Sequence, residues 1–207
     1  LFSAEASPTI NPKLQDPFFA PVDVASAISI IKDSDKDYDF EGIVKLNNCS
    51  GSLVMFKGDT MKRKAIMLTN GHCTGKGSRI VMGFSRMLDM GEILVNTPHR
   101  RRVSLFHKGS SPVARMQTTQ ILYASMTDTD LALYELEKTY QEIKDRYDID
   151  PLILDDQQPL EETSIEIISG YWERGYHCFI DETIHRLKED IWIWKDSLRY
   201  SQPGCET

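Results

Sequence analysis

The chain has 207 residues and a formal net charge of −7 at neutral pH, and 41% of its residues are hydrophobic and 27% charged. This is an ordinary globular composition, with enough apolar residues to bury a sizeable core. The acidic balance argues against nucleic-acid binding, because neutralising phosphates requires a surplus of Lys and Arg. No apolar run approaches the length of a membrane span, so we also expect no membrane-spanning segment.

Residues 1–39 predict an extended arm followed by an acidic turn. The first part carries four prolines among small and polar residues, which excludes a helix or a central strand: Pro8, Pro12, Pro17 and Pro21. Four aspartates then alternate with other residues: Asp33, Asp35, Asp37 and Asp39. A calcium loop wants glycine where Tyr38 stands and a closing glutamate where Val44 stands, so we expect a solvated turn and no metal site.

Short strands dominate the region from residue 40 to 136. Glycine, asparagine and charged turns separate eight candidate strands, at residues 42–46, 51–56, 65–69, 79–84, 92–96, 103–107, 120–124 and 131–136. Strands of this length and density predict an all-β barrel or sandwich. The basic run at residues 99–102, HRRR, is typical of a solvated loop; a patch for an acidic partner or a processing site is the alternative.

The β pattern is interrupted at residues 137–147, where helix-favouring residues predict a connector helix with Glu142 paired to Arg146. The helix should end before the Asp150–Pro151 step. Strands resume at residues 164–170, 176–181 and 190–196. In the last of these, alternation places Trp192 and Trp194 on one face. Packing in the core or between sheets is their expected use, with a substrate-stacking platform as the alternative.

Three segments carry residues suited to chemistry. An apolar strand ends in TNGHC at residues 69–73, which places the His72 imidazole at a strand end beside Cys73. Before it, CSGSL at residues 49–53 opens a small-residue strand with Cys49. After it, DLAL at residues 130–133 puts the Asp130 carboxylate at the mouth of a strand. Together they supply a base, an acid to orient it and a disulfide to fix the base.

These segments, in this order, resemble the trypsin-like serine proteases of the chymotrypsin fold. A strand at residues 168–172, ISGYW, resembles that family's entry into its second barrel, and the likeness extends from about residue 40 to 205. The resemblance implies an all-β fold of two six-stranded antiparallel β-barrels of the chymotrypsin type, with the second barrel incomplete in this chain and one short connector helix. The implied segments are residues 1–39 (arm and acidic turn), 40–136 (first barrel), 137–162 (connector) and 163–207 (first part of the second barrel).

The resemblance also implies a serine endopeptidase that works through an acyl-enzyme, with a polypeptide substrate. His72 is then the general base and Asp130 its orienting acid, with Asp128 as the runner-up acid. The family's nucleophilic serine follows a cysteine, so we expect it just beyond Thr207, in a companion C-terminal segment of roughly 50 to 100 residues that completes the second barrel. The Ile-Val-Gly-Gly terminus of typical zymogens of this family does not occur in the chain, which departs from the usual zymogen activation.

Two other functions stay open at this point. One is a catalytically inactive homologue that acts as a binding protein. The other is an unrelated disulfide-stapled β protein.

Four cysteines fall into two pairs, Cys49 with Cys73 and Cys178 with Cys205. Two disulfides would place the protein in an oxidising compartment, secreted or periplasmic, whereas reduced cysteines would fit a cytosolic protein. The spacing of Cys and His matches no zinc pattern, so we predict neither a metal nor a cofactor.

Overall fold

The computed structural model describes residues 38–81 and 85–201; the predicted N-terminal arm therefore lies almost wholly outside the described residues, as does Cys205. Strands make up most of the described part, with one α-helix, α2 (Tyr140–Tyr147), and one short 3-10 helix, η1 (Gly71–Thr74). The strands are β1 (Ile43–Lys45), β2 (Ser50–Met55), β3 (Lys64–Thr69), β4 (Arg79–Val81), β5 (Ser85–Met87), β6 (Ile93–Pro98), β7 (Arg102–Phe106), β8 (Pro112–Ser125), β9 (Leu131–Thr139), β10 (Leu152–Ile153), β11 (Ser164–Ser169), β12 (Arg174–Glu189) and β13 (Trp192–Ser201). No helix in this part is both long enough and apolar enough to cross a membrane.

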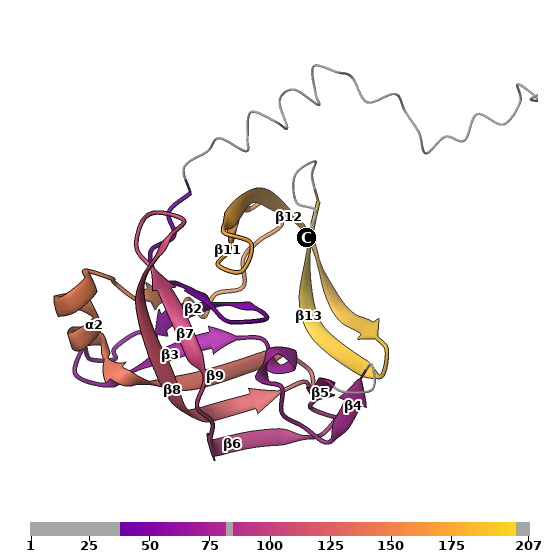
Figure 1. Ribbon diagram of the computed structural model, residues 1–207. Coiled ribbons are helices and arrows are strands. Elements are labelled where there is room, and N and C mark those ends of the chain that lie inside the picture. Colours follow the sequence, from indigo (N-terminus) through magenta and orange to yellow (C-terminus); the bar gives the residue numbers. More distant parts are fainter. Residues whose placement is uncertain (1–37, 82–84, 202–207) are drawn as a thin grey trace, which may run out of the picture. The chain divides into compact units, whose positions relative to one another are not determined.

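Six antiparallel strands close into a barrel, in the order β1, β2, β3, β9, β8, β7 and back to β1 (Figure 1). The ring closes because β1 pairs with β2 along one edge and with β7 along the other. Closure leaves these six strands without a free edge. Outside the ring, β6 pairs with β8, and β10 runs parallel to β2. The predicted all-β class and a first six-stranded barrel are thus confirmed.

The barrel core follows from alternation along the strands. In β9, Ala132, Tyr134 and Leu136 are fully buried, while the residues between them are only partly buried. Each barrel strand presents every second side chain to the inside, so the six strands together fill the interior. Burial of this apolar surface stabilises the barrel by about 25 cal/mol per Å². The outward-facing Leu131 and Leu133 are half-buried.

The remaining long strands form a three-stranded antiparallel sheet in the order β11, β12, β13. Trp192 and Trp194 are 5% and 8% exposed and stack with nearly parallel rings, so the packing interpretation of this pair is confirmed. The predicted strand at residues 190–196 is wrong at its start. Glu189 pairs with Trp192, so Asp190 and Ile191 form a two-residue hairpin turn, and Asp190 has the positive φ of 51° that such turns require.

The connector helix is confirmed, but it begins three residues later than predicted. The backbone stays extended through Thr139 because β9 continues to pair with β3, and Thr139 then caps α2. Its side chain accepts a hydrogen bond from the Glu142 N–H, and the Glu142 carboxylate accepts one from the Thr139 N–H at 2.6 Å. Glu142 therefore closes a capping box, and its predicted pairing with Arg146 is wrong.

Other observed strand boundaries differ from the predicted ones because backbone pairing extends a strand beyond its apolar residues. β8 and β12 are much longer than predicted, and the short β5 and β10 were not predicted. Pairing with β7, β9 and β6 keeps β8 extended through residues 112–119, where buried and exposed side chains alternate from Ala114 to Thr118.

The three-stranded sheet contacts the barrel beside Cys49. Ser50, the first residue of β2, shares a hydrogen bond of 3.0 Å with the Ser169 hydroxyl and accepts one from the Tyr171 N–H. Close by, Lys45 of β1 pairs with Glu173 at 2.6 Å. The turn between β11 and β12 is thereby fixed to the beginning of β2.

The β12–β13 hairpin makes a second contact with the barrel. The Trp192 indole N–H donates to the Leu88 carbonyl at 3.1 Å, and the Lys195 N–H donates to the Asp128 carbonyl at 2.7 Å. Arg79 pairs with Asp190 at the hairpin turn. The barrel and the sheet therefore meet on two sides of the region that contains His72.

Candidate functional site

His72 lies in η1, the single helical turn that follows β3. The Asn70–Gly71 pair predicted a turn here, and a turn occurs. Such pairs usually form turns because glycine tolerates a positive φ, but glycine is needed here for another reason. Gly71 does not adopt a positive φ. A Cβ at this position would overlap the Ser125 carbonyl oxygen at the end of β8, so only glycine allows this close approach. Contact with β8 thus fixes where η1 presents its histidine.

The structure brings His72 and Asp130 together although 58 positions separate them, as the sequence predicted. The His72 Nδ1 lies 2.6 Å from the Asp130 Oδ2, and the His72 backbone N–H donates to Oδ1 at 2.9 Å. The Asn70 side-chain amide donates to Oδ2 at 3.2 Å. Three donors therefore fix one carboxylate, and that carboxylate fixes the imidazole in orientation and tautomer.

Charge at this pair follows from the same contacts. The hydrogen bond to Asp130 raises the pKa of His72, against the effect of burial, and the charges of Asp130 and Glu189 add to the rise. Burial opposes ionisation of Asp130, but hydrogen bonds from the His72 side chain and backbone and from Asn70 outweigh it, so its pKa lies below the ordinary value. Glu189, the last residue of β12, contributes the smallest part of the rise in the pKa of His72.

Asp128, the runner-up acid, is directed elsewhere. Its carboxylate pairs with Lys195 of β13 at 2.7 Å, and its φ of 63° turns the chain just before Asp130. Asp130 is therefore the acid that contacts His72.

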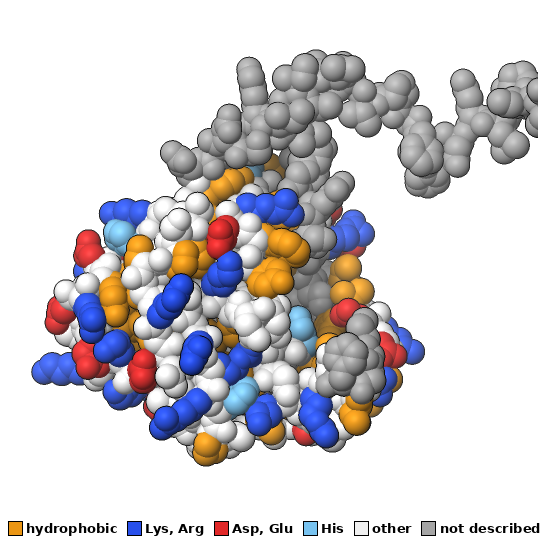
Figure 2. Space-filling view, in the orientation of Figure 1, with side chains coloured by type: hydrophobic (Ala, Val, Ile, Leu, Met, Phe, Trp, Pro, Cys, Tyr) orange, Lys and Arg blue, Asp and Glu red, His pale blue; other side chains and the backbone are white. Residues whose placement is uncertain are grey.

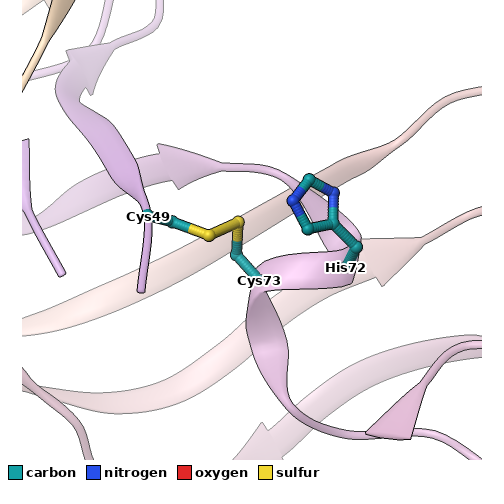
Figure 3. Close-up of side chains that lie close together, drawn as sticks. All are labelled: Cys49, His72 and Cys73. Carbon is teal, nitrogen blue, oxygen red and sulfur yellow. A yellow bond between two sulfur atoms is a disulfide. The ribbon is translucent and has the colours of Figure 1, made fainter. Parts of the chain in front are cut away.

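The Cys49–Cys73 disulfide joins the residue before β2 to η1 and lies directly beside His72 (Figure 3). Its two Cα atoms are 6.2 Å apart, and it closes a loop over 24 positions, which stabilises the fold by about 3 kcal/mol through loop-closure entropy. This predicted pair is confirmed. Cys178 is fully buried in β12, and its predicted partner Cys205 lies outside the described residues.

Arg101 is a part of the site that sequence reasoning missed. Its guanidinium donates to the Cys73 carbonyl and, at 2.6 Å each, to the side-chain oxygens of Asn47 and Asn48. It therefore links the two chain segments that the disulfide also joins. Within a run of three arginines, nothing in the sequence singles out the one that turns inward.

His99 is the second residue of that run with a defined environment. Its Nδ1 lies 3.2 Å from the hydroxyl of the buried Tyr134. Burial, with the nearby charges of Lys76 and Arg101, lowers the pKa of His99 to about 4. The prediction of a wholly solvated loop is wrong for His99 and Arg101. Figure 2 shows Lys and Arg side chains spread over the visible face with Asp and Glu between them, not gathered in one patch.

Among the described residues, a single group of His, Cys, Asp and Glu side chains has the spacing of a metal site. It consists of Cys49, His72 and Cys73, whose ligand atoms all lie within 4.8 Å of one another. With the two sulfurs joined in a disulfide, neither is a thiolate that could bind a metal.

Neither a model of a known protein family nor a curated protein sequence matches this chain.

Proposed function

We propose that this chain carries the base and the orienting acid of a serine endopeptidase of the chymotrypsin type. The observation that carries the proposal is the His72–Asp130 contact, in which Nδ1 is bound and Nε2 remains for a nucleophile. An imidazole oriented by a carboxylate fixed by three donors is the arrangement that general-base catalysis by histidine requires. The closed six-stranded barrel and the adjacent disulfide support the same family.

In the proposed reaction, the nucleophilic serine attacks the peptide carbonyl while His72 Nε2 takes its proton. Asp130 accepts the hydrogen bond from Nδ1–H and stabilises the imidazolium that forms. His72 then gives the proton to the leaving amine, and a water molecule, activated in the same way, hydrolyses the acyl-enzyme. The substrate is a polypeptide, and no cofactor takes part.

The proposal places the serine on sequence that follows Thr207. The described strands β11 and β13 form the edges of the three-stranded sheet, and β proteins generally cover or pair such edges. Further strands from a companion C-terminal segment would complete a second barrel here and bring the serine to His72. The Cys49–Cys73 disulfide fits a protein that matures in an oxidising compartment, such as the periplasm or the extracellular space.

A matched set of variants, each assayed together with the companion C-terminal segment that carries the serine, tests the proposal. We expect the wild-type protein to hydrolyse fluorogenic peptides and to be labelled on one serine by a fluorophosphonate. His72→Ala and Asp130→Asn should each lower turnover by roughly 10⁴-fold. The controls are His185→Ala and Asp196→Asn, which break an exposed His–Asp pair of similar geometry at 2.8 Å and should leave turnover unchanged.

Two outcomes would contradict the endopeptidase. A folded His72→Ala protein with normal turnover would remove the histidine from the mechanism. A folded wild-type protein without hydrolysis or labelling would favour the inactive homologue that acts as a binding protein.

A further inference from the structure

Three potential metal ligands converge where β2 begins and η1 follows β3. The sulfurs of Cys49 and Cys73 and one nitrogen of His72 lie within 4.8 Å of one another (Figure 3). Two thiolates and an imidazole form a donor set that zinc prefers, with a fourth position open to water. While the disulfide is formed, the two sulfurs are not thiolates and cannot bind a metal.

Reduction converts this cluster into a complete ligand set. A dithiol that reduces the disulfide gives up two electrons and two protons, becomes a disulfide itself and leaves two protein thiols. The thiols lose their protons when Zn²⁺ binds, so one metal ion replaces two protons. Cys49 is only half-buried, so its sulfur is the one that an attacking thiolate reaches, while Cys73 is buried.

The two cysteines are positioned by contacts other than their own bond. Arg101 binds the Cys73 carbonyl on one side and Asn47 and Asn48 on the other. The Leu46 N–H also donates to the Cys49 carbonyl at 2.9 Å. Two sulfurs on a tetrahedral zinc lie about 3.8 Å apart, as follows from Zn–S bonds of about 2.3 Å, and unbonded thiols in contact separate by a similar distance.

His72 already has the surroundings of a zinc ligand. Its Nδ1 is bound by Asp130, so Nε2 is the nitrogen available to a metal. Histidine ligands almost always donate their second N–H to a carboxylate or carbonyl, which fixes the ring and increases its basicity. The side chain is 42% exposed, which leaves room for the water that completes four-coordination.

We propose that reduction of the Cys49–Cys73 disulfide creates a zinc site made of both thiolates and His72 Nε2. The metal and the general base would then compete for the same nitrogen. In a reducing compartment zinc holds His72 out of any proton transfer. A small disulfide takes two electrons from the zinc-bound thiolates and becomes two thiolates itself; the Cys49–Cys73 bond forms again, Zn²⁺ leaves and the imidazole is released. The inference goes beyond the proposed function, because metal binding is measurable whether or not the protein hydrolyses peptides.

Cobalt binding to the purified full chain tests this site. A phosphine reductant converts each disulfide to two thiols with one water and leaves as its oxide; it is removed anaerobically before Co²⁺ or Zn²⁺ is added. We expect the reduced protein to bind one Co²⁺ with a thiolate-to-cobalt charge-transfer band and tetrahedral d–d bands, and Zn²⁺ to displace it. The oxidised protein should show neither band.

Variants assign the ligands. Cys49→Ser and Cys73→Ser should abolish the charge-transfer band, His72→Gln should weaken binding at least tenfold, and Asp130→Asn should weaken it by about 10- to 100-fold as an outer-shell change. Cys178→Ser with Cys205→Ser is the matched control and should retain the site.

The inference is overturned if the reduced protein, with its circular dichroism intact, gives no thiolate band, or if the band survives Cys49→Ser. If reduction alone unfolds the barrel, Zn²⁺ must restore the circular dichroism in the control variant; failure to do so also overturns it.

Discussion

At the scale of single residues, the site shows how a few hydrogen bonds set the behaviour of one imidazole. Asp130 accepts from three donors: the side-chain amide of Asn70, and the backbone N–H and the ring Nδ1–H of His72. Each charge-assisted bond favours the ionised carboxylate, and the carboxylate in turn favours the protonated imidazole. The raised pKa of His72 and the lowered pKa of Asp130 are therefore two expressions of one interaction.

The pKa of His72 supplies a prediction. Because its folded-state pKa lies above 6.5, the ion pair contributes stability below pH 6.5, and this contribution is lost as pH rises through the folded-state value. Neutral His72, the form that accepts a proton, becomes the major species only above the raised pKa. An NMR titration of the His72 ring should therefore show a value above 6.5 in the wild type and a lower one in Asp130→Asn. Asp196→Asn should leave it unchanged, and an equal value in the wild type and Asp130→Asn would contradict the assignment.

At the scale of elements, the sequence predicts the helix α2 but not its contact with the barrel, which is made by Tyr140. The Tyr140 hydroxyl, at its first position, donates to the Val54 carbonyl at 2.5 Å and accepts from the Ile66 N–H at 3.1 Å. Val54 and Ile66 lie directly opposite each other in β2 and β3. A side chain from the connector thus bridges two barrel strands at a buried position.

We expect Tyr140→Phe to lower the free energy of unfolding by about 1–3 kcal/mol, because one backbone donor and one acceptor lose their partner while buried. Urea denaturation followed by circular dichroism measures the change. Tyr123→Phe, on β8, is the matched control and should cost under about 0.5 kcal/mol. Equal losses in the two variants would show that the bridging hydroxyl does not contribute.

The sequence correctly predicted the helices and strands that depend on residues close together in the chain. The six barrel strands, the connector helix and the hairpin tryptophans all follow from alternation, propensity and turn residues. The errors fall where the cause lies in another segment. Glu142 caps α2 because β9 delivers Thr139 in an extended conformation, and Arg101 turns inward because Asn47, Asn48 and the Cys73 carbonyl offer it acceptors. Such partners are set by tertiary structure, which spacing along the chain does not encode.

At the scale of the whole described unit, the barrel and the three-stranded sheet meet at two contacts around His72. One is the Ser50–Ser169 contact beside Cys49, and the other is the β12–β13 hairpin against Leu88 and Asp128. The motifs placed His72 and Asp130 correctly because both lie at the ends of barrel strands. The effect of Glu189 on His72 was not predictable, since it depends on how the hairpin packs against the barrel.

The last prediction concerns the hairpin contact, which depends on one buried indole. Trp192 is 5% exposed, stacks on Trp194, lies under the Arg79 guanidinium and donates to the Leu88 carbonyl. Trp192→Ala removes all of these contacts. The barrel closes through its own backbone pairing, so we expect the loss to fall on the hairpin.

Hydrogen exchange followed by mass spectrometry measures this directly. Amides at the turn end of β12 and β13 should exchange at least about 100-fold faster in Trp192→Ala, since deleting a buried tryptophan typically costs 3–5 kcal/mol and 1.4 kcal/mol is a factor of ten. Amides of β3 and β9 should keep their protection. Trp172→Ala, which truncates a tryptophan that is 66% exposed, is the control and should change neither region. A uniform increase across barrel and hairpin would mean that the two unfold as one cooperative unit, and unchanged exchange would mean that Trp192 does not anchor the hairpin. The expected pattern instead means that the hairpin opens separately from the barrel. The barrel then maintains the His72–Asp130 pair while the Glu189 charge on the hairpin changes its distance from His72.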